Sequence, residues 1–235
     1  MKAASQIDKP VLIVGGGPVG MTMALCLAKR GIPSYLVELR SAETLPDVKC
    51  NHISSRSMEL FRSLGISQDL RAAGLPDDYP HDVSYRTSTL GEEIARIHIP
   101  GRNTRLTDHS GPDGNWPTPE PPHRINQRYI EPILRRHVQK QSLITCLYRH
   151  QVLSFTQDEN QVTAHIQNLD QPESKSLTLS AAYMVGCDGG RSMVRKGMGA
   201  KLVGDEVVQR VQSTCIRAPH LIEHMKAPPA WAMFT

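Results

Sequence analysis

Residues 11–31 read VLIVGGGPVGMTMALCLAKRG, and this stretch decides the predicted fold of the chain. Its first four residues are apolar, and so short an apolar run is typical of a strand buried on both faces, as in a parallel sheet. The next six residues contain the pattern G-x-G-x-x-G, whose glycines are Gly15, Gly17 and Gly20. Apolar side chains then recur at intervals of four residues, at Val19, Met23 and Leu27. We expect a helix with these three side chains on one face, and with Lys29, Arg30 and Gly31 as its last turn and cap.

Each residue of the glycine turn has a physical role if a dinucleotide binds there. Gly15 allows the tight turn out of the strand, and Gly17 lets the main chain approach a pyrophosphate because it has no Cβ. Gly20 lets the helix pack closely on the strand, and Pro18 suits the first helical turn, where an N–H group is not needed. The free N–H groups and the positive end of the helix dipole then face the diphosphate.

An acidic residue follows at the distance expected for nucleotide binding. Glu38 ends a second predicted strand, residues 34–39, about twenty residues beyond the glycines. A carboxylate there accepts hydrogen bonds from ribose hydroxyls and repels a 2′-phosphate. The alternative is a glycine turn in an ordinary βαβ unit, with Glu38 merely solvated. The strand, turn, helix and strand in succession favour a dinucleotide, without distinguishing FAD from NAD.

The composition describes a globular protein of one or two domains. The chain has 235 residues, and its net charge of +4 is too mild to indicate nucleic-acid binding. No apolar run reaches the length of a membrane span. Five widely spaced cysteines without a C-x-x-C pair indicate reduced thiols in a cytoplasmic protein. The ten histidines and five cysteines show no metal-ligand spacing, so no metal site is predicted.

The rest of the chain alternates between predicted helices and strands. In chain order these are a helix near 56–65 capped by Ser54 or Ser55, antiparallel strands at 83–88 and 93–99, a helix at 127–140, a third parallel strand at 143–147, three short strands forming a β-meander, and a buried strand at 183–185. Residues 100–122 are rich in Pro, Gly, Asp and Asn. They predict a long loop, and we favour a disordered surface excursion over a lid above a substrate entrance.

Three blocks of sequence together resemble one protein family. The first is GGGPVG with Glu38, and the second is KCNHISSRSMELFRSLGI at 49–66 followed by INQRYIEPIL at 125–134. The third is CDGGRSMVR at 187–195. In order and spacing the blocks resemble the FAD-dependent aromatic hydroxylases, the single-component flavoprotein monooxygenases related to p-hydroxybenzoate and phenol hydroxylases. The likeness covers most of residues 10–200.

The resemblance implies a cofactor-binding role for each of ten residues. Those that would hold the FAD pyrophosphate are Gly15, Gly17, Pro18, Val19 through its N–H, and Gly20. Glu38 would bind the adenosine ribose. Arg40 and Lys49 would lie near the phosphates or at the approach of the nicotinamide nucleotide. Gln127 would hydrogen-bond the linker of the flavin.

Asp188 is the last of the ten, and it would help fix FAD and, with Arg191, the route of NAD(P)H. From the residues alone, a Gly-Gly turn at the end of a strand suits main chain that approaches a ligand. The alternative for Asp188 is a simple helix cap.

The implied fold is α/β, with two domains. A Rossmann-like FAD-binding domain, residues 1–80 and 124–205, contains the inserted antiparallel β-meander, and residues 81–123 and 206–235 form a partial antiparallel substrate domain. The family carries a third, Gly-Asp motif beside the flavin ring, and no such block occurs before Thr235. We therefore expect the truncated N-terminal portion of a longer protein, without full activity.

The implied reaction is hydroxylation of a small aromatic, phenolic molecule with NAD(P)H and O₂. NAD(P)H would reduce FAD, and the reduced cofactor would use O₂ to oxygenate the ring, so the protein itself need not supply the reactive group. Asn51 and His52 are therefore not assigned catalytic roles, and no catalytic residue is predicted. An NAD-dependent Rossmann dehydrogenase and a non-catalytic nucleotide-binding remnant stay open as alternatives. The sequence predicts neither the substrate nor the oligomeric state.

Overall fold

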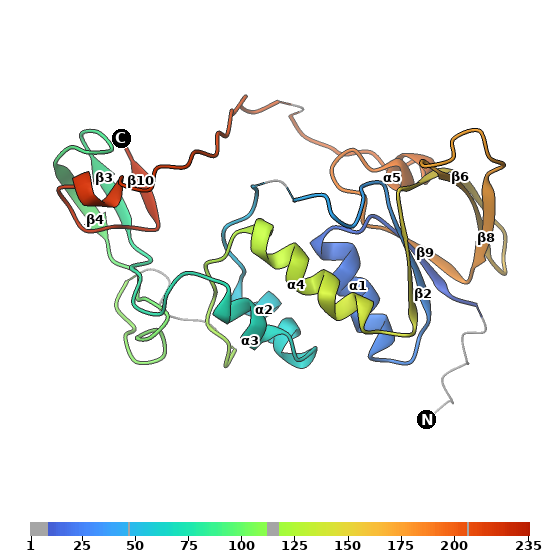
Figure 1. Cartoon of the computed structure of the whole chain (residues 1–235), viewed down its shortest axis with the longest axis horizontal. Helices are drawn as coiled ribbons and strands as arrows, with labels where there is room; N and C mark the ends of the chain where they lie inside the picture. Colours follow the sequence, from blue (N-terminus) through green and yellow to red (C-terminus); the bar gives the residue numbers. More distant parts are fainter. Residues whose placement is uncertain (1–8, 47, 112–117, 206) are drawn as a thin grey trace. The chain divides into compact units, whose positions relative to one another are not determined.

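The computed structural model describes residues 9–46, 48–111, 118–205 and 207–235 (Figure 1). The chain forms two compact units, which are Met1–Asp47 with Ile130–Val208 and Val48–Tyr129 with Gln209–Thr235. None of the helices in the described part of the chain combines the length and apolarity that a membrane span requires. The units differ from the predicted domains mainly at residues 48–80, which group with the second unit.

Main-chain hydrogen bonds explain why residues 48–80 group with the second unit. Ile53 and His123 exchange two such bonds, of 2.8 and 2.9 Å. The N–H of Gln127 donates to the carbonyl of Cys50 at 2.9 Å. These bonds pair two stretches that lie far apart in sequence, and local sequence patterns do not encode such a pairing. The assignment of residues 48–80 to an FAD-binding domain stays a prediction.

A four-stranded parallel sheet forms the centre of the first unit. Its strands, in spatial order, are β5 (Ile144–Tyr148), β2 (Ser34–Glu38), β1 (Val11–Val14) and β9 (Tyr183–Gly186). The sequence predicted each of these strands, and the arrangement confirms the α/β class. The predicted burial of residues 183–185 is wrong, because β9 is an edge strand with none of its residues buried. All four residues of β1 are buried, which explains its uninterrupted apolar run.

Different layers cover the two faces of the parallel sheet (Figure 1). Helix α1 (Pro18–Ala28) contacts β1, β2 and β5 on one face. On the other face lies an antiparallel sheet of β6 (His150–Gln157), β7 (Val162–Asn168) and β8 (Leu177–Ala181). The buried side chains packed between the two sheets include Leu12, Val14, Val37, Val152, Ala164 and Ile166. Burial of each larger aliphatic side chain stabilises the unit by about 1.5–3 kcal/mol.

Helix α1 buries a different face from the predicted one. Val19 is 69% exposed, and the buried residues of the helix are Gly20, Met21, Ala24, Leu25 and Ala28. The predicted helix is confirmed, but of its predicted apolar face Val19 points to solvent, and Met23 and Leu27 are half-buried. A Cβ on Gly20 would lie 1.8 Å from the carbonyl oxygen of Gly15, so the chain can approach β1 this closely only at a glycine. That approach sets the rotation of the helix and turns Val19 outward.

Two further helices belong wholly or mainly to the first unit. α4 (Gln127–Gln139) matches the predicted helix, and its residues from Ile130 onward lie in this unit. α5 (Met193–Gly197) is a short helix after β9. Its N-cap is Ser192, whose Oγ accepts a hydrogen bond from the N–H of Arg195 at 2.9 Å.

The second unit combines short helices with a small sheet. Its elements are α2 (Ser55–Ser63), α3 (Ser67–Ala72), β3 (Val83–Arg86), β4 (Glu93–Ile97), the 3₁₀ turn η1 (Ile222–His224) and β10 (Ala232–Phe234). Ser54, one of the two predicted caps, accepts a hydrogen bond from the N–H of Ser57 at 3.4 Å. β3 pairs antiparallel with β4, as predicted, and parallel with β10.

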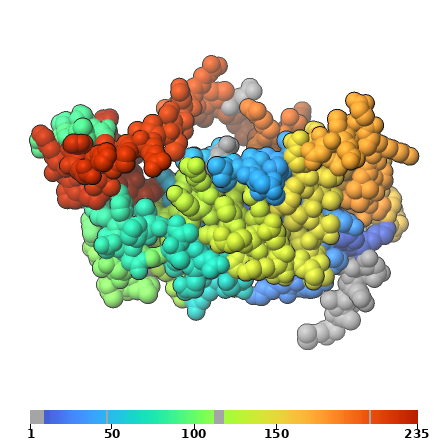
Figure 2. Space-filling view, in the orientation of Figure 1, coloured from blue at the N-terminus to red at the C-terminus, as the bar shows by residue number. Residues whose placement is uncertain are grey.

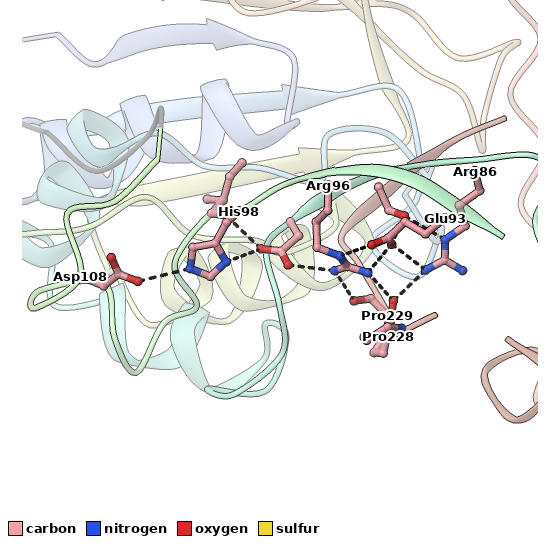
Figure 3. A network of polar contacts seen from close by, with 10 residues as sticks. Arg86, Glu93, Arg96, His98, Asp108, Pro228 and Pro229 are labelled. Carbon is pink, nitrogen blue, oxygen red and sulfur yellow. Dashed lines mark hydrogen bonds and ion pairs between the residues drawn. The ribbon is translucent and has the colours of Figure 1, made fainter. Parts of the chain in front are cut away.

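One face of this small sheet carries a network of charged side chains (Figure 3). Arg96 forms ion pairs of 2.8 Å with Asp82 and 2.7 Å with Glu93. The same guanidinium donates hydrogen bonds to the carbonyl oxygens of Pro228 and Pro229, at 2.7 and 3.2 Å. Hydrogen bonding from Arg96 lowers the pKa of Glu93 to about 2. The network therefore fastens the segment before β10 to the β3–β4 hairpin.

Residues 100–122 form a loop, as predicted, and its described parts are packed within the second unit. Arg105 is 1% exposed, and Glu120 forms an ion pair with Arg71. Arg105 and Glu120 thus anchor parts of the loop to the second unit, the choice between a surface excursion and a lid stays a prediction, and 112–117 lie outside the described residues. Residues 207–218, in contrast to Arg105 and Glu120, have exposed side chains and form neither helix nor strand (Figure 2).

Candidate functional site

A cavity of about 680 Å³ opens at the carboxyl ends of β1, β2 and β9. This edge of an open parallel sheet is where ligands bind. Seven of the ten predicted cofactor-binding residues line the cavity, and they are Gly15, Gly17, Pro18, Val19, Glu38, Arg40 and Asp188. The structure thus brings together residues from three sequence segments within one unit.

Two of the three motif glycines are required by the packing of the protein itself. Gly15 has a φ of +106°, a conformation that residues with a side chain rarely adopt. A Cβ on Gly15 would also lie 2.4 Å from the carbonyl oxygen of Cys187. Gly20 does not line the cavity and instead packs against Gly15, as its predicted role required.

Gly17 differs from the other two because no protein atom requires it. A Cβ built on Gly17 would have no neighbour within 4 Å, and its φ of −72° suits any residue. Gly17 is the N-cap of α1, and Pro18 follows it in the first turn. The missing side chain therefore leaves space at a helix N-terminus, where unpaired N–H groups favour an anion.

Glu38 ties the end of β2 to the glycine turn. Its Oε2 accepts a hydrogen bond of 2.6 Å from the N–H of Gly16, and its Oε1 accepts two of 2.9 Å from the main chain and the Nε of Arg40. The residue is 8% exposed. A carboxylate has about four acceptor positions, so the three bonds leave capacity for a ligand hydroxyl at the cavity.

Arg40 joins two carboxylates at the rim of the cavity. Besides bonding Glu38, its Nη2 lies 3.4 Å from Oε2 of Glu131, a fully buried residue of α4. The pairing holds the Arg40 side chain against the protein and offsets the burial of Glu131. Sequence reasoning missed Glu131, although an acidic residue among the buried apolar positions of a predicted helix was a usable signal.

Asp188 caps the helix that follows β9. Its Oδ1 accepts a 2.6 Å hydrogen bond from Ser192 Oγ, and its Oδ2 accepts bonds of 2.7 and 3.3 Å from the N–H groups of Met193 and Val194. The helix-cap alternative is therefore realised in the structure, while contact with FAD stays a prediction. Burial, and next the charge of Asp188, raise the pKa of the Cys187 thiol, which disfavours a thiolate nucleophile beside the cavity.

The remaining wall of the cavity comes from β6, which sequence reasoning did not include. Residues 150–153 line it, with Val152 buried and Leu153 at the surface. The sequence predicted a short strand here. Its place beside the glycine turn depends on the packing of one sheet on another, so no local pattern could have indicated it.

The other two predicted residues, Lys49 and Gln127, lie in the second unit. They are neighbours there, because the N–H of Gln127 donates to the carbonyl of Lys49 at 3.2 Å. The second unit has its own cavity of about 450 Å³, lined by Asn51 among others. In its wall the guanidinium of Arg124 lies 3.8 Å from the ring centre of Trp231.

A match to a known family covers almost the entire chain. Residues 8–234 match the family described as FAD binding domain. The chain belongs to this family. The match favours FAD over NAD as the dinucleotide, a choice that the glycine motif left open.

Two curated relatives of this chain are a monooxygenase and a hydroxylase. Phenol 2-monooxygenase of Pseudomonas sp. (strain EST1001) is 30% identical over 198 residues, which cover 83% of this chain and 31% of the relative. The 3-(3-hydroxy-phenyl)propionate/3-hydroxycinnamic acid hydroxylase of Comamonas testosteroni is 31% identical over 235 residues, covering 94% of this chain and 35% of the relative. The chain spans about a third of the length of the curated relatives it matches.

Solved structures of similar proteins share the fold. The flavin-dependent monooxygenase PieE, solved in complex with FAD and substrate, aligns with a TM-score of 0.72 and 31% identity, over 86% of this chain and 34% of PieE. The rebeccamycin biosynthetic enzyme RebC with reduced flavin aligns with a TM-score of 0.70 and 35% identity, over 82% of this chain and 34% of RebC.

The cavity of the FAD binding domain chain fits the adenosine diphosphate half of FAD. Gly17 leaves space that a Cβ would fill, directly at the N-terminus of α1. Glu38 presents a buried carboxylate with a spare acceptor position at the end of β2. A helix N-terminus followed by a carboxylate matches the order of diphosphate and ribose in that half of the cofactor.

Proposed function

We propose that the protein to which this chain belongs is an FAD-dependent monooxygenase that hydroxylates small phenolic compounds with NAD(P)H and O₂. The observation that carries the proposal is the cavity at the carboxyl ends of β1, β2 and β9, with the unobstructed N-cap at Gly17. The names of the relatives, a phenol 2-monooxygenase and a hydroxyphenylpropionate hydroxylase among them, support the phenolic substrate class.

When bound, FAD supplies the redox chemistry of oxygenation, and the residues of this chain bind and orient it. The N–H groups at Gly17 and Val19 hold the diphosphate, and Glu38 accepts hydrogen bonds from the ribose hydroxyls. Arg40 keeps the Glu38 carboxylate in place through the 2.9 Å contact to Oε1. These residues act on the nucleotide and take no part in the oxygenation step.

The finer domain assignments are part of the same proposal. The sheet of β6, β7 and β8 is the β-meander inserted in a Rossmann-like FAD-binding domain, and β3, β4 and β10 belong to a substrate domain. Lys49, Gln127 and Asp188 contact the cofactor or the nicotinamide nucleotide in the complete protein. A cytoplasmic location is also proposed, and the five free cysteines support it.

The proposal is tested on the purified full-length protein. We expect a yellow protein that releases FAD, identified by HPLC, and that oxidises NADH or NADPH faster when a phenol is added. The 235-residue chain is measured beside it for flavin content. A colourless full-length protein that reduces a ketone with NADH would instead establish the dehydrogenase alternative.

A further inference from the structure

The turn between β5 and β6 lies directly beside the proposed ribose-binding carboxylate. In the sheet register Tyr148, the last residue of β5, is the partner of Glu38. Arg149 then adopts a φ of +57°, and its N–H donates to the carbonyl of Arg40 at 3.2 Å. The turn is thus held against the end of β2, and His150, the first residue of β6, lines the same cavity as Glu38.

The hydrogen bonding of His150 selects one of the two tautomers of its neutral ring. Its Nδ1 lies 2.6 Å from the carbonyl oxygen of Tyr148. A carbonyl oxygen only accepts, so Nδ1 carries the proton and Nε2 of the neutral ring is an acceptor. His150 also shares a face of β6 with Val152, because side chains alternate along a strand, and Val152 belongs to the same buried core cluster as Val37.

The walls near His150 suit a flat apolar ring. Val37 and Val152 are buried at the cavity, whereas Leu39 and Leu153 are 52% and 51% exposed. A planar base between these side chains would cover apolar surface that is otherwise in contact with water. Taken in chain order, the groups that line the cavity are therefore the glycine turn, the Glu38 carboxylate, and then apolar side chains beside Nε2 of His150.

We propose that His150 is a specificity-determining residue that recognises adenine. Its Nε2 accepts a hydrogen bond from the exocyclic 6-amino group of the base, while apolar side chains that line the cavity contact the ring. The inference rests on the proposed function, because it places the adenosine end of FAD in this cavity. It predicts selection against a 6-oxo purine, whose position 6 offers an acceptor to the acceptor Nε2.

The test measures binding of ADP and IDP to the purified full-length protein, stripped of flavin, by isothermal titration calorimetry, without turnover of the enzyme. We expect ADP to bind on the order of tenfold more tightly than IDP. His150→Leu should remove the preference by weakening ADP, with little change for IDP. His150→Gln, which can place an amide oxygen near the position of Nε2, should retain part of it. His165→Leu, on β7 and outside the cavity lining, should keep the full preference.

The outcomes separate this inference from the function on which it rests. Equal affinities for ADP and IDP in a protein that binds FAD overturn the role of His150 alone. The same conclusion follows if His150→Leu and His150→Gln discriminate as well as the unmodified chain. A protein that binds neither ADP nor FAD overturns the proposed function and the inference together.

Discussion

The N–H of Gly16 donates a hydrogen bond of 2.6 Å to the Oε2 of Glu38. The bond joins the turn after β1 to the last residue of β2, and a Cβ on Gly16 would lie only 2.8 Å from the Cβ of Glu38. Glu38 therefore shapes the glycine turn as well as facing the cavity. Its substitution should affect both the stability of the turn and the binding of nucleotide.

Glu38→Ala should weaken binding of FAD by about 1.5–3 kcal/mol, because charge-assisted hydrogen bonds to the ribose are lost. Calorimetric titration with FAD measures the effect, and urea denaturation measures the accompanying loss of stability. Glu43→Ala removes an exposed carboxylate that is not part of the cavity lining, and it should change neither quantity. Unchanged FAD affinity in Glu38→Ala would show that the ribose does not bind there.

Gly17→Ala should leave folding intact and impair nucleotide binding. The new Cβ meets no protein atom within 4 Å, so we expect the free energy of unfolding to fall by only about 1 kcal/mol, the preference of an N-cap for Gly over Ala. It enters the space at the helix N-terminus, and FAD affinity should fall on the order of tenfold or more. Gly190→Ala is the matched control, because its Cβ also meets nothing and Gly190 is not part of the lining. Equal FAD affinities in the two variants would contradict a diphosphate at Gly17.

Gly20→Ala, in contrast to Gly17→Ala, should mainly lower the stability of the first unit. Its Cβ would lie 1.8 Å from the carbonyl oxygen of Gly15, so α1 must move away from β1. We expect the free energy of unfolding to fall by about 3 kcal/mol, at the upper end of typical overpacking effects. Urea denaturation beside Gly17→Ala measures the difference. A stability equal to that of Gly17→Ala would mean that the helix is not held so closely.

The second unit should lose stability in mild acid because of His123. Burial lowers the pKa of His123 from 6.5 to about 4, and its Nε2 donates to the carbonyl of Leu70 at 2.8 Å. Between these values the unfolded chain binds a proton that the folded one does not, so stability is full above pH 6.5 and falls as the pH drops toward 4. The difference between 6.5 and about 4 corresponds to a loss of up to about 3 kcal/mol of stability.

The pH dependence is measured by denaturation of the unmodified chain and of His123→Gln. Glutamine can keep a donor toward Leu70 but does not titrate, so the part of the pH dependence between 4 and 6.5 that His123 causes should disappear. If both proteins show the same slope in this range, other groups are responsible.

Arg96→Met should loosen the segment that leads into β10. Asp82 is a buried carboxylate, and removal of its partner at 2.8 Å should lower the free energy of unfolding by about 3 kcal/mol. Amide hydrogen exchange in Ala232–Phe234 should become faster, because the bonds to Pro228 and Pro229 are lost as well. Lys226→Met is the control, since it removes only an exposed ion pair with Glu92. Similar exchange rates in the two variants would show that Arg96 does not hold the segment before β10 in place.

Local sequence predicted most elements of the first unit. The parallel strands, α1, α4 and the glycine turn were each indicated by short-range patterns, because steric demands on glycine and the period of apolar side chains act over a few residues. Where the periodicity was misread, at Val19, the close approach of Gly20 to Gly15 decided which face of the helix is buried.

The sequence by itself determined the strand, the glycine turn and the helix that follows it, since every residue involved lies between Val11 and Ala28. Only the tertiary structure decided that Glu38 bonds Gly16, that Glu131 holds Arg40, and that His150 reaches the same cavity. Those contacts join segments separated by 22 to more than 100 residues. They depend on strand register and on the packing of one sheet against another, which no local pattern specifies.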